Sequence, residues 1–176
     1  MSEKQKVELT IREAIPTDAA EILQVLNQIR KETDFLTMDE SDISISVEEE
    51  EKMLARIFDS VNNALLLAIV DEKIVGTISI HADYHPRVAH IGEIGISILK
   101  EHWGYGLGTI LMEEAIAWAS ESGIIRRLQL TVQDRNDRAI HIYEKLGFQT
   151  EAIMERGAIA ENGEFLPVHL MSLMIN

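Results

Sequence analysis

The 176-residue sequence has no cysteine and no long apolar run. Without cysteine, disulfides, cysteine-ligated zinc sites and a cysteine nucleophile are all excluded. No stretch reaches the roughly 20 apolar residues of a membrane-spanning helix, so we expect no membrane span. The opening MSEKQKVELTIREA has no apolar signal-peptide core. Together with the lack of cysteine, this start leads us to expect a cytoplasmic protein.

Positive charge is also scarce, because 16 Lys and Arg face 30 Asp and Glu, for a net charge of −14. Nucleic-acid binding depends on basic phosphate contacts, so we expect no nucleic-acid partner. Acidity favours a cationic small molecule only weakly, since solubility explains most acidic surfaces equally well. No repeat, low-complexity tract or Pro/Gly/Ser linker divides the chain. We therefore expect a single domain over residues 1–176.

Apolar periodicity and turn residues predict the element order β-α-α-β-β-β-α-β-α-β-β. Asp18 and Glu21 have the spacing of a helix capping box, and the polar stretch 30–44 is predicted to be a loop. Strand 90–99 has apolar residues on both faces, which predicts burial on both sides. This order indicates an α+β fold with a mixed sheet and helices on both faces. The other strands are expected at 7–13, 64–70, 74–82, 126–132 and near the C-terminus, and the helices from Asp18, at 47–61, at 107–122 and from Asn136 to Leu146.

The stretch HWGYGLGTILM, residues 102–112, places Gly104, Gly106 and Gly108 directly before an apolar helix. A glycine-rich turn at a helix N-terminus offers free N–H groups to a phosphate, because no Cβ blocks the approach. A tight turn with close packing is the alternative. A Walker A loop needs Lys after its last glycine, but Thr109 and Ile110 stand here. The G-x-G-x-G spacing also differs from the dinucleotide fingerprint.

Two motifs together resemble the GNAT superfamily of acetyl-CoA-dependent N-acetyltransferases. Gly106 and Gly108 match the glycines of its Arg/Gln-x-x-Gly-x-Gly/Ala loop, with Trp103 at the Arg/Gln position. Thirty residues later, NDRAIHIYEKLGF matches Asn-x-x-Ala-x-x-x-Tyr-x-x-x-Gly-Phe in register. The expected order of elements fits this fold over nearly the whole chain. The resemblance implies about seven mostly antiparallel strands flanked by helices on both faces.

The resemblance also implies how acetyl-CoA binds. Backbone groups of Ile96 and Ile98 would bind the pantetheine arm as if it were another strand. The main chain of the glycine loop would hold the pyrophosphate, and Asn136 would contact the pantetheine, cap a helix, or do both. The loop residues implied are Trp103, Gly104, Tyr105, Gly106, Leu107, Gly108 and Thr109.

By the same resemblance, an amine attacks the thioester directly, without a metal ion and without an enzyme-bound acyl group. Tyr143 matches the family's general acid, although it could instead be a packed aromatic side chain. Glu93 is our choice for general base, acting through a water, because a carboxylate in an apolar strand needs a reason. His81 and His90 are rival bases, since imidazole titrates near the working pH.

The segment KETDF resembles the family's acceptor-side loop, which makes Glu32, Thr33 and Phe35 candidates for binding the amine. The acceptor would be a small molecule or a protein N-terminus. The C-terminal hairpin resembles one that helps family members to form homodimers. A non-catalytic acyl-CoA sensor of the same fold is the alternative function. A packing role for the glycines, with no coenzyme A bound, is the third hypothesis.

Overall fold

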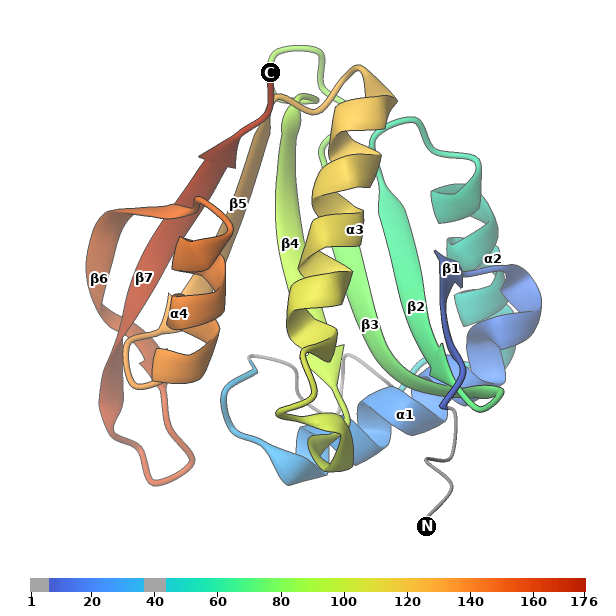
Figure 1. The fold of residues 1–176 in the computed structure, drawn as a ribbon, viewed down its shortest axis with the longest axis horizontal. Helices are drawn as coiled ribbons and strands as arrows, with labels where there is room; N and C mark the ends of the chain where they lie inside the picture. The colour runs from blue at the N-terminus through green and yellow to red at the C-terminus, as the bar shows by residue number, and fades with distance from the viewer. Residues whose placement is uncertain (1–6, 37–43) are drawn as a thin grey trace, which may run out of the picture.

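The computed structural model describes residues 7–36 and 44–176, and its elements follow the predicted order. Figure 1 shows a single twisted sheet with helices against it. The strands are β1 (Leu9–Glu13), β2 (Ala64–Val70), β3 (Lys73–His81), β4 (Ile91–Ile98), β5 (Arg127–Gln133), β6 (Gln149–Ile159) and β7 (Phe165–Met174). The helices are α1 (Ala19–Glu32), α2 (Val47–Phe58), α3 (Leu107–Ser122) and α4 (Asp137–Lys145), with short 3-10 turns η1 (Pro16–Asp18) and η3 (Lys100–His102).

The seven strands are hydrogen-bonded in the order β1-β2-β3-β4-β5-β7-β6. Every neighbouring pair is antiparallel except β4 and β5, which are parallel. The last strand, β7, therefore lies between β5 and β6. The mixed, mostly antiparallel sheet expected from the sequence is confirmed.

Helices cover the two faces of the sheet unequally. The larger core joins α3 and α4 to β2–β5 and β7, with Leu111, Met112 and Leu128 fully buried. A smaller core on the opposite face packs α1 and α2 against β2 and β3 through Ile22, Leu54 and other apolar side chains. On that second face, Glu93 of β4 and Thr131 of β5 are exposed. The sheet thus has one covered face and one half-covered face.

Glycine and asparagine end and begin the helices where the sequence predicts. Gly123 after α3 and Gly147 after α4 have φ of 68° and 98°, values that non-glycine residues rarely adopt. The Asn136 side chain caps α4 by accepting from the Ala139 N–H at 3.3 Å. Because these caps are local, periodicity and turn chemistry were enough to place both helices.

Three boundary predictions were wrong. Helix α1 runs to Glu32, three residues into the predicted polar loop, and residues 37–43 of that loop lie outside the described residues. Helix α2 ends at Phe58 rather than at residue 61. The Asp18–Glu21 capping box does not form, because tertiary partners take both carboxylates. Asp18 accepts hydrogen bonds from Arg12, and Glu21 accepts one from the Ile74 N–H at 2.9 Å.

Pro167 is the third residue of β7, near the strand's start. The pairing of β7 with β6 is irregular between Met154 and Ala158, opposite this proline. A proline has no N–H for the ladder, so this break in pairing tolerates it. Among the described residues, no helix is long and apolar enough to cross a membrane.

Candidate functional site

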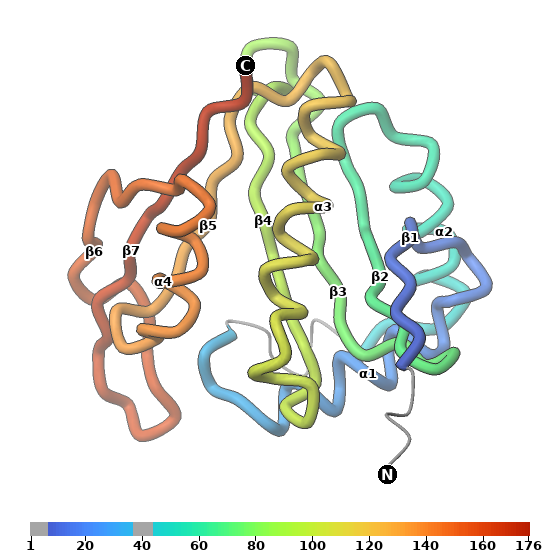
Figure 2. Tube along the Cα trace, in the orientation of Figure 1, coloured from blue at the N-terminus to red at the C-terminus, as the bar shows by residue number. Residues whose placement is uncertain are grey.

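Strands β4 and β5 pair for only three residues, Ile91–Glu93 with Arg127–Gln129, and then diverge. Figure 2 shows the two strands close together near the C-terminus and far apart at the opposite end. We call residues 94–98 of β4 and 130–133 of β5, with the space between them, the β4–β5 fork. Along this stretch β4 still pairs with β3, but no strand of the described residues pairs with its other edge. Ile96 and Ile98 therefore lie on an edge that an extended molecule can join.

The glycine loop stands at the open end of the fork. Gly104 and Gly106 have φ of 84° and 82°, the left-handed region that favours glycine. A Cβ added to Gly106 would meet no atom within 4 Å, so the space over this residue is open. The first helical hydrogen bond here runs from the Ile110 N–H to the Gly106 carbonyl. The preceding N–H groups of the first turn, up to Thr109, are therefore free for an anion.

The three bulky loop residues are used in different ways. The Trp103 indole N–H donates to the Ile98 carbonyl at 2.8 Å and ties the loop to the end of β4. Leu107 packs into the main core, whereas the side chain of Tyr105 is 82% exposed. The first turn of α3 thus offers anions its backbone, and the side chain of Trp103 stabilises the loop.

Tyr143 lies on α4, which follows β5, on the other side of the fork from β4. The side chain is buried beside Phe148, with ring centroids 6.0 Å apart. Burial raises the pKa of Tyr143 to about 12, so the phenol stays protonated at neutral pH. Within the described residues no hydrogen bond engages its hydroxyl. The phenol is thus a hydrogen-bond donor that has no partner among residues 7–36 and 44–176.

Glu93 is the last β4 residue that pairs with β5, so it stands where the fork begins. The prediction that both faces of this strand are buried was wrong, because Glu93 and Gly95 are exposed on the half-covered face. Glu93 lines a hollow of about 250 Å³ and pairs across the ladder with His81, which lines it too. His90 does not line this hollow. Its backbone carbonyl accepts from the N–H groups of Arg126 and Arg127, at the start of β5.

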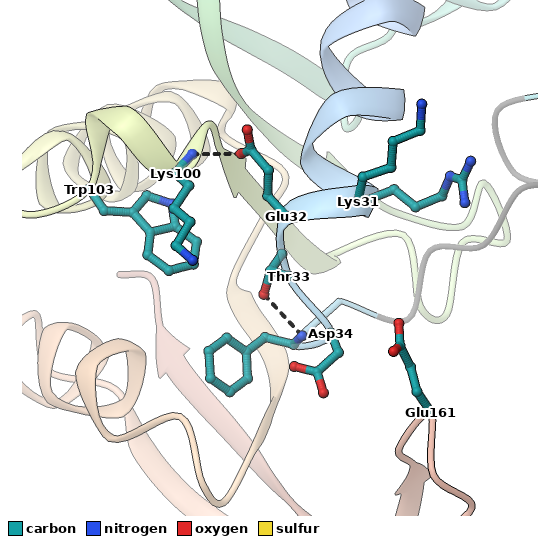
Figure 3. Close-up of a pocket in the computed structure, with 9 residues that line it drawn as sticks. Lys31, Glu32, Thr33, Asp34, Lys100, Trp103 and Glu161 are labelled. Atoms are coloured by element: carbon teal, nitrogen blue, oxygen red, sulfur yellow. Dashed lines mark hydrogen bonds between the residues drawn. The ribbon is translucent and has the colours of Figure 1, made fainter.

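A larger open pocket of about 600 Å³ lies between the end of α1, the turn after β4 and the β6–β7 hairpin. Figure 3 shows Trp103 and Lys100 on one side of it and Glu161 on the other. All three acceptor-side candidates from the sequence line this pocket, namely Glu32, Thr33 and Phe35. Arg30, Lys31, Asp34, Lys100 and Glu161 also line it and were not predicted.

Hydrogen bonds already engage two of those three candidates. The Glu32 carboxylate accepts from the Lys100 N–H at 2.8 Å, and the Thr33 hydroxyl accepts from the Phe35 N–H at 3.1 Å. Both bonds shape the wall of the pocket (Figure 3). The ring of Phe35, half-buried, has the guanidinium of Arg135 over it, 5.3 Å from the ring centroid. Nowhere in 7–36 or 44–176 do three or more His, Asp or Glu side chains gather as metal ligands would.

Comparison with known proteins agrees with this geometry. The profile of the acetyltransferase (GNAT) family matches residues 28–148. A solved GNAT-family acetyltransferase from Streptococcus pneumoniae is 49% identical, with a TM-score of 0.92, over 96% of this chain and 100% of that one. An L-amino acid N-acetyltransferase of Escherichia coli is 30% identical over 66% of this chain and 72% of its own length.

The yncA acetyltransferase of Salmonella typhimurium, solved with acetyl-CoA, has the same fold at 21% identity. Its TM-score is 0.82, and the match covers 96% of this chain and 95% of that one. The family profile spans both sequence motifs, from the glycine loop to Phe148. The chain therefore belongs to the acetyltransferase (GNAT) family and is an acetyl-CoA-dependent N-acetyltransferase.

Proposed function

We propose that this protein, as a single domain, transfers the acetyl group of acetyl-CoA directly to a primary amine of a small molecule. The observation that carries the proposal is the fork. It offers one unpaired strand edge, an open glycine loop at its mouth and a protonated phenol on the helix across it. Pantetheine would pair with β4 at Ile96 and Ile98, and pyrophosphate would bind the N–H groups up to Thr109.

Starting from a protonated amine, the reaction removes two protons from the nitrogen and leaves one on the sulfur. An alkyl amine is mostly protonated at neutral pH, so a base must free its lone pair before it attacks the thioester carbon. Glu93, exposed at the start of the fork, would accept this proton through a water, with His81 beside it as the rival. The new C–N bond forms as the C–S bond breaks, the electron pair leaves on sulfur as a thiolate, and the nitrogen loses its second proton as the amide forms.

Tyr143 would stabilise the leaving thiolate. Because the pKa of its phenol is about 12, the proton stays on oxygen until the sulfur acquires charge. A hydrogen bond from the phenol to that sulfur is then stronger than one to the neutral thioester. Burial of Tyr143 also keeps water away from this bond.

The acceptor side is the 600 Å³ pocket. Its lining carries both signs of charge, including Lys31 and Lys100 against Glu161. A pocket of this kind suits a small polar amine, and the amino-acid substrate in the name of the Escherichia coli relative supports that class. Glu32, Thr33 and Phe35 would form its wall, as the sequence predicts.

Calorimetric titration with acetyl-CoA tests the cofactor site, with Thr109→Glu compared against Thr109→Gln. A glutamate in the first turn is favourable for α3 itself, so the fold should be retained. Its charge would repel the pyrophosphate, and we expect acetyl-CoA to bind about tenfold more weakly, while the neutral Gln variant stays near wild type. Equal affinities for the two variants would contradict the proposed phosphate site.

A screen of free-thiol release then tests turnover, using L-amino acids, spermidine and short peptides with free N-termini. We expect at least one small amine to accelerate the release of coenzyme A. Tight acetyl-CoA binding without release for any amine would favour the non-catalytic sensor. Release with peptides alone would identify a protein N-terminus as the acceptor.

We also propose that the protein forms a homodimer in the cytoplasm. Strand β6 is exposed along most of its length and lies at the edge of the sheet. Ile153, Ile159 and Phe165 of the β6–β7 hairpin are each more than half exposed. Unpaired, apolar edge strands favour association. Light scattering on the eluted protein should give twice the 19.9 kDa chain mass.

A further inference from the structure

We propose that Gln133 and Arg135, at the end of β5, are positioning residues for the acceptor. They hold residues 33–35 across the open end of the fork, and this fixes the wall of the acceptor pocket. The inference rests on the proposed function. Neither residue belongs to the two family motifs, although both stand just before Asn136 in the sequence.

Gln133 is 5% exposed, and both ends of its amide are engaged. The Nε2 group donates to the carbonyls of Asp34 and Phe35, at 3.0 and 3.4 Å. The Oε1 atom accepts from Arg135 Nε at 2.8 Å. A buried amide is costly unless it is hydrogen-bonded, so this side chain specifies one position of the 33–35 backbone.

Arg135 adds a second set of contacts to the same segment. Its guanidinium pairs with the Asp34 carboxylate at 2.8 Å and lies over the Phe35 ring, 5.3 Å from its centroid. Arg135 is itself exposed, so these contacts are made at the surface of the pocket. Together the two side chains fix the backbone, the acidic group and the aromatic ring of the segment.

The other end of the segment is tied to β4. Glu32 accepts from the Lys100 N–H just beyond that strand, as Figure 3 shows. Residues 32–35 therefore run from the end of β4 to the end of β5, the two strands that the fork separates. A short segment attached at both ends holds the distance between them.

We call residues 32–35, held by Lys100 at one end and by Gln133 and Arg135 at the other, the clamp. The turn after β5 supports this clamp. The Asp134 N–H donates to the Pro167 carbonyl at 2.9 Å, and the Asp134 carboxylate contacts His169 at 2.6 Å. The next residue, Asn136, caps α4, which carries Tyr143. One turn thus positions both the acceptor wall and the helix with the proton donor. Displacing residues 33–35 would therefore raise KM for the amine, while kcat would change little.

The test uses Arg135→Ala, because this exposed residue can be replaced without opening the core. We expect KM for the best amine of the thiol-release screen to rise about tenfold, with kcat and the acetyl-CoA Kd within about twofold of wild type. Arg135→Lys should give an intermediate KM. Lysine keeps the positive charge near Asp34, but it lacks the planar guanidinium group that donates to Gln133 and lies over the Phe35 ring.

Arg156→Ala is the matched control, since the guanidinium of Arg156 also lies over an aromatic ring, 5.1 Å from the Phe165 ring centroid, and neither residue lines the acceptor pocket. We expect its kinetics to match wild type. In hydrogen exchange, Arg135→Ala should speed exchange of the amides at 33–36 and leave those of α4 unchanged.

An unchanged amine KM for Arg135→Ala, or equal losses in both Arg variants, would overturn the inference. So would unchanged exchange at 33–36. Absence of acetyl-CoA binding in the wild type would instead sink the proposed function, and the exchange result would still decide whether the clamp exists.

Discussion

Strands β1 to β4 and strands β5 to β7 belong to one sheet but differ in how they are held. The first four strands pair in chain order through antiparallel ladders, with one bulge between Ala68 and Ile69, and helices cover both faces of β2 and β3. Strands β5 and β7 are covered by helices on one face only, and β6 is exposed along almost its whole length at the edge. Three parallel residue pairs join the two groups.

This difference places the site. β2 and β3 pair with a strand on each side, so little of their backbone is free to bind a ligand, and they serve as support. The ladder ends after Glu93, and from there the β4 backbone, the α3 N-terminus and the α4 helix all face the same fork. The candidate functional residues therefore lie where the pairing of β4 with β5 ends, and the clamp at residues 32–35 connects the two groups of strands there. The following changes should separate the roles of the two groups.

The largest expected effect is on the fork side, in Tyr143→Phe. Removal of the phenol hydroxyl should lower kcat by about 100- to 1,000-fold, because a hydrogen-bond donor aimed at charge that develops in the transition state contributes that much. The ring keeps its contact with Phe148, and the hydroxyl has no hydrogen bond to lose among the described residues. Stability should therefore change by less than about 1 kcal/mol. A variant with full kcat in the thiol-release assay would exclude this donor.

Two leucine truncations compare the groups directly. Leu128 on β5 and Leu67 on β2 are both fully buried, so Leu128→Ala and Leu67→Ala should each cost about 2–5 kcal/mol of unfolding free energy. Leu128 lies at the three-pair junction, opposite Gly92, so we expect only Leu128→Ala to weaken acetyl-CoA binding as well. Denaturant unfolding and calorimetry on both variants check this. Equal acetyl-CoA affinities would show that the junction does not control the fork.

The smallest effect is expected from Glu50→Gln on α2. Glu50 is 8% exposed, and burial raises the pKa of its carboxyl above the ordinary value. Its ionised form is therefore disfavoured by folding, and the cost develops as pH rises through the folded-state pKa. The Gln variant should be slightly more stable than wild type at pH 7, and the difference should disappear below about pH 4.

Thermal unfolding at both pH values measures the Glu50 effect, with acetyl-CoA affinity unchanged. A gain that persists at low pH would point to packing rather than to charge. Asp18 provides the contrast, because hydrogen bonds from Arg12 lower the pKa of its carboxyl. Its contribution to stability is present above its ordinary pKa and is lost as pH falls through the lowered value.

Local signals predicted much of this molecule, and long-range contacts account for what they missed. Gly123, Asn136 and Gly147 act on their own turns, so their roles were readable from the sequence. The Asp18–Glu21 spacing failed because Arg12 and the Ile74 N–H, the latter 53 residues from Glu21, compete better for the carboxylates.

The acceptor pocket was predicted only in part, for the same reason. Gln133 contacts Asp34, which is 99 residues away in the sequence, and hydrophobic periodicity does not predict contacts between such distant residues. Two polar side chains at a strand end, directly before the Asn136 motif, were the available signal. Glu93 was selected as a base because it interrupts an apolar strand. Its apolar neighbours suggested that it is buried, but it is exposed because no helix of the described residues covers that face of the sheet there.

The insertion of β7 between β5 and β6 also orders events during synthesis on the ribosome. Strands β1 to β4 can pair as soon as each emerges, since every partner has already been made. Strand β5 then has β4 on one edge for three residues only, and its other edge waits for the final strand. Loop closure over such separations is slow. The nascent chain can consequently pair β1 to β4 well before β7 is made, and β5 acquires its second neighbouring strand only after residues 165–174 have been translated.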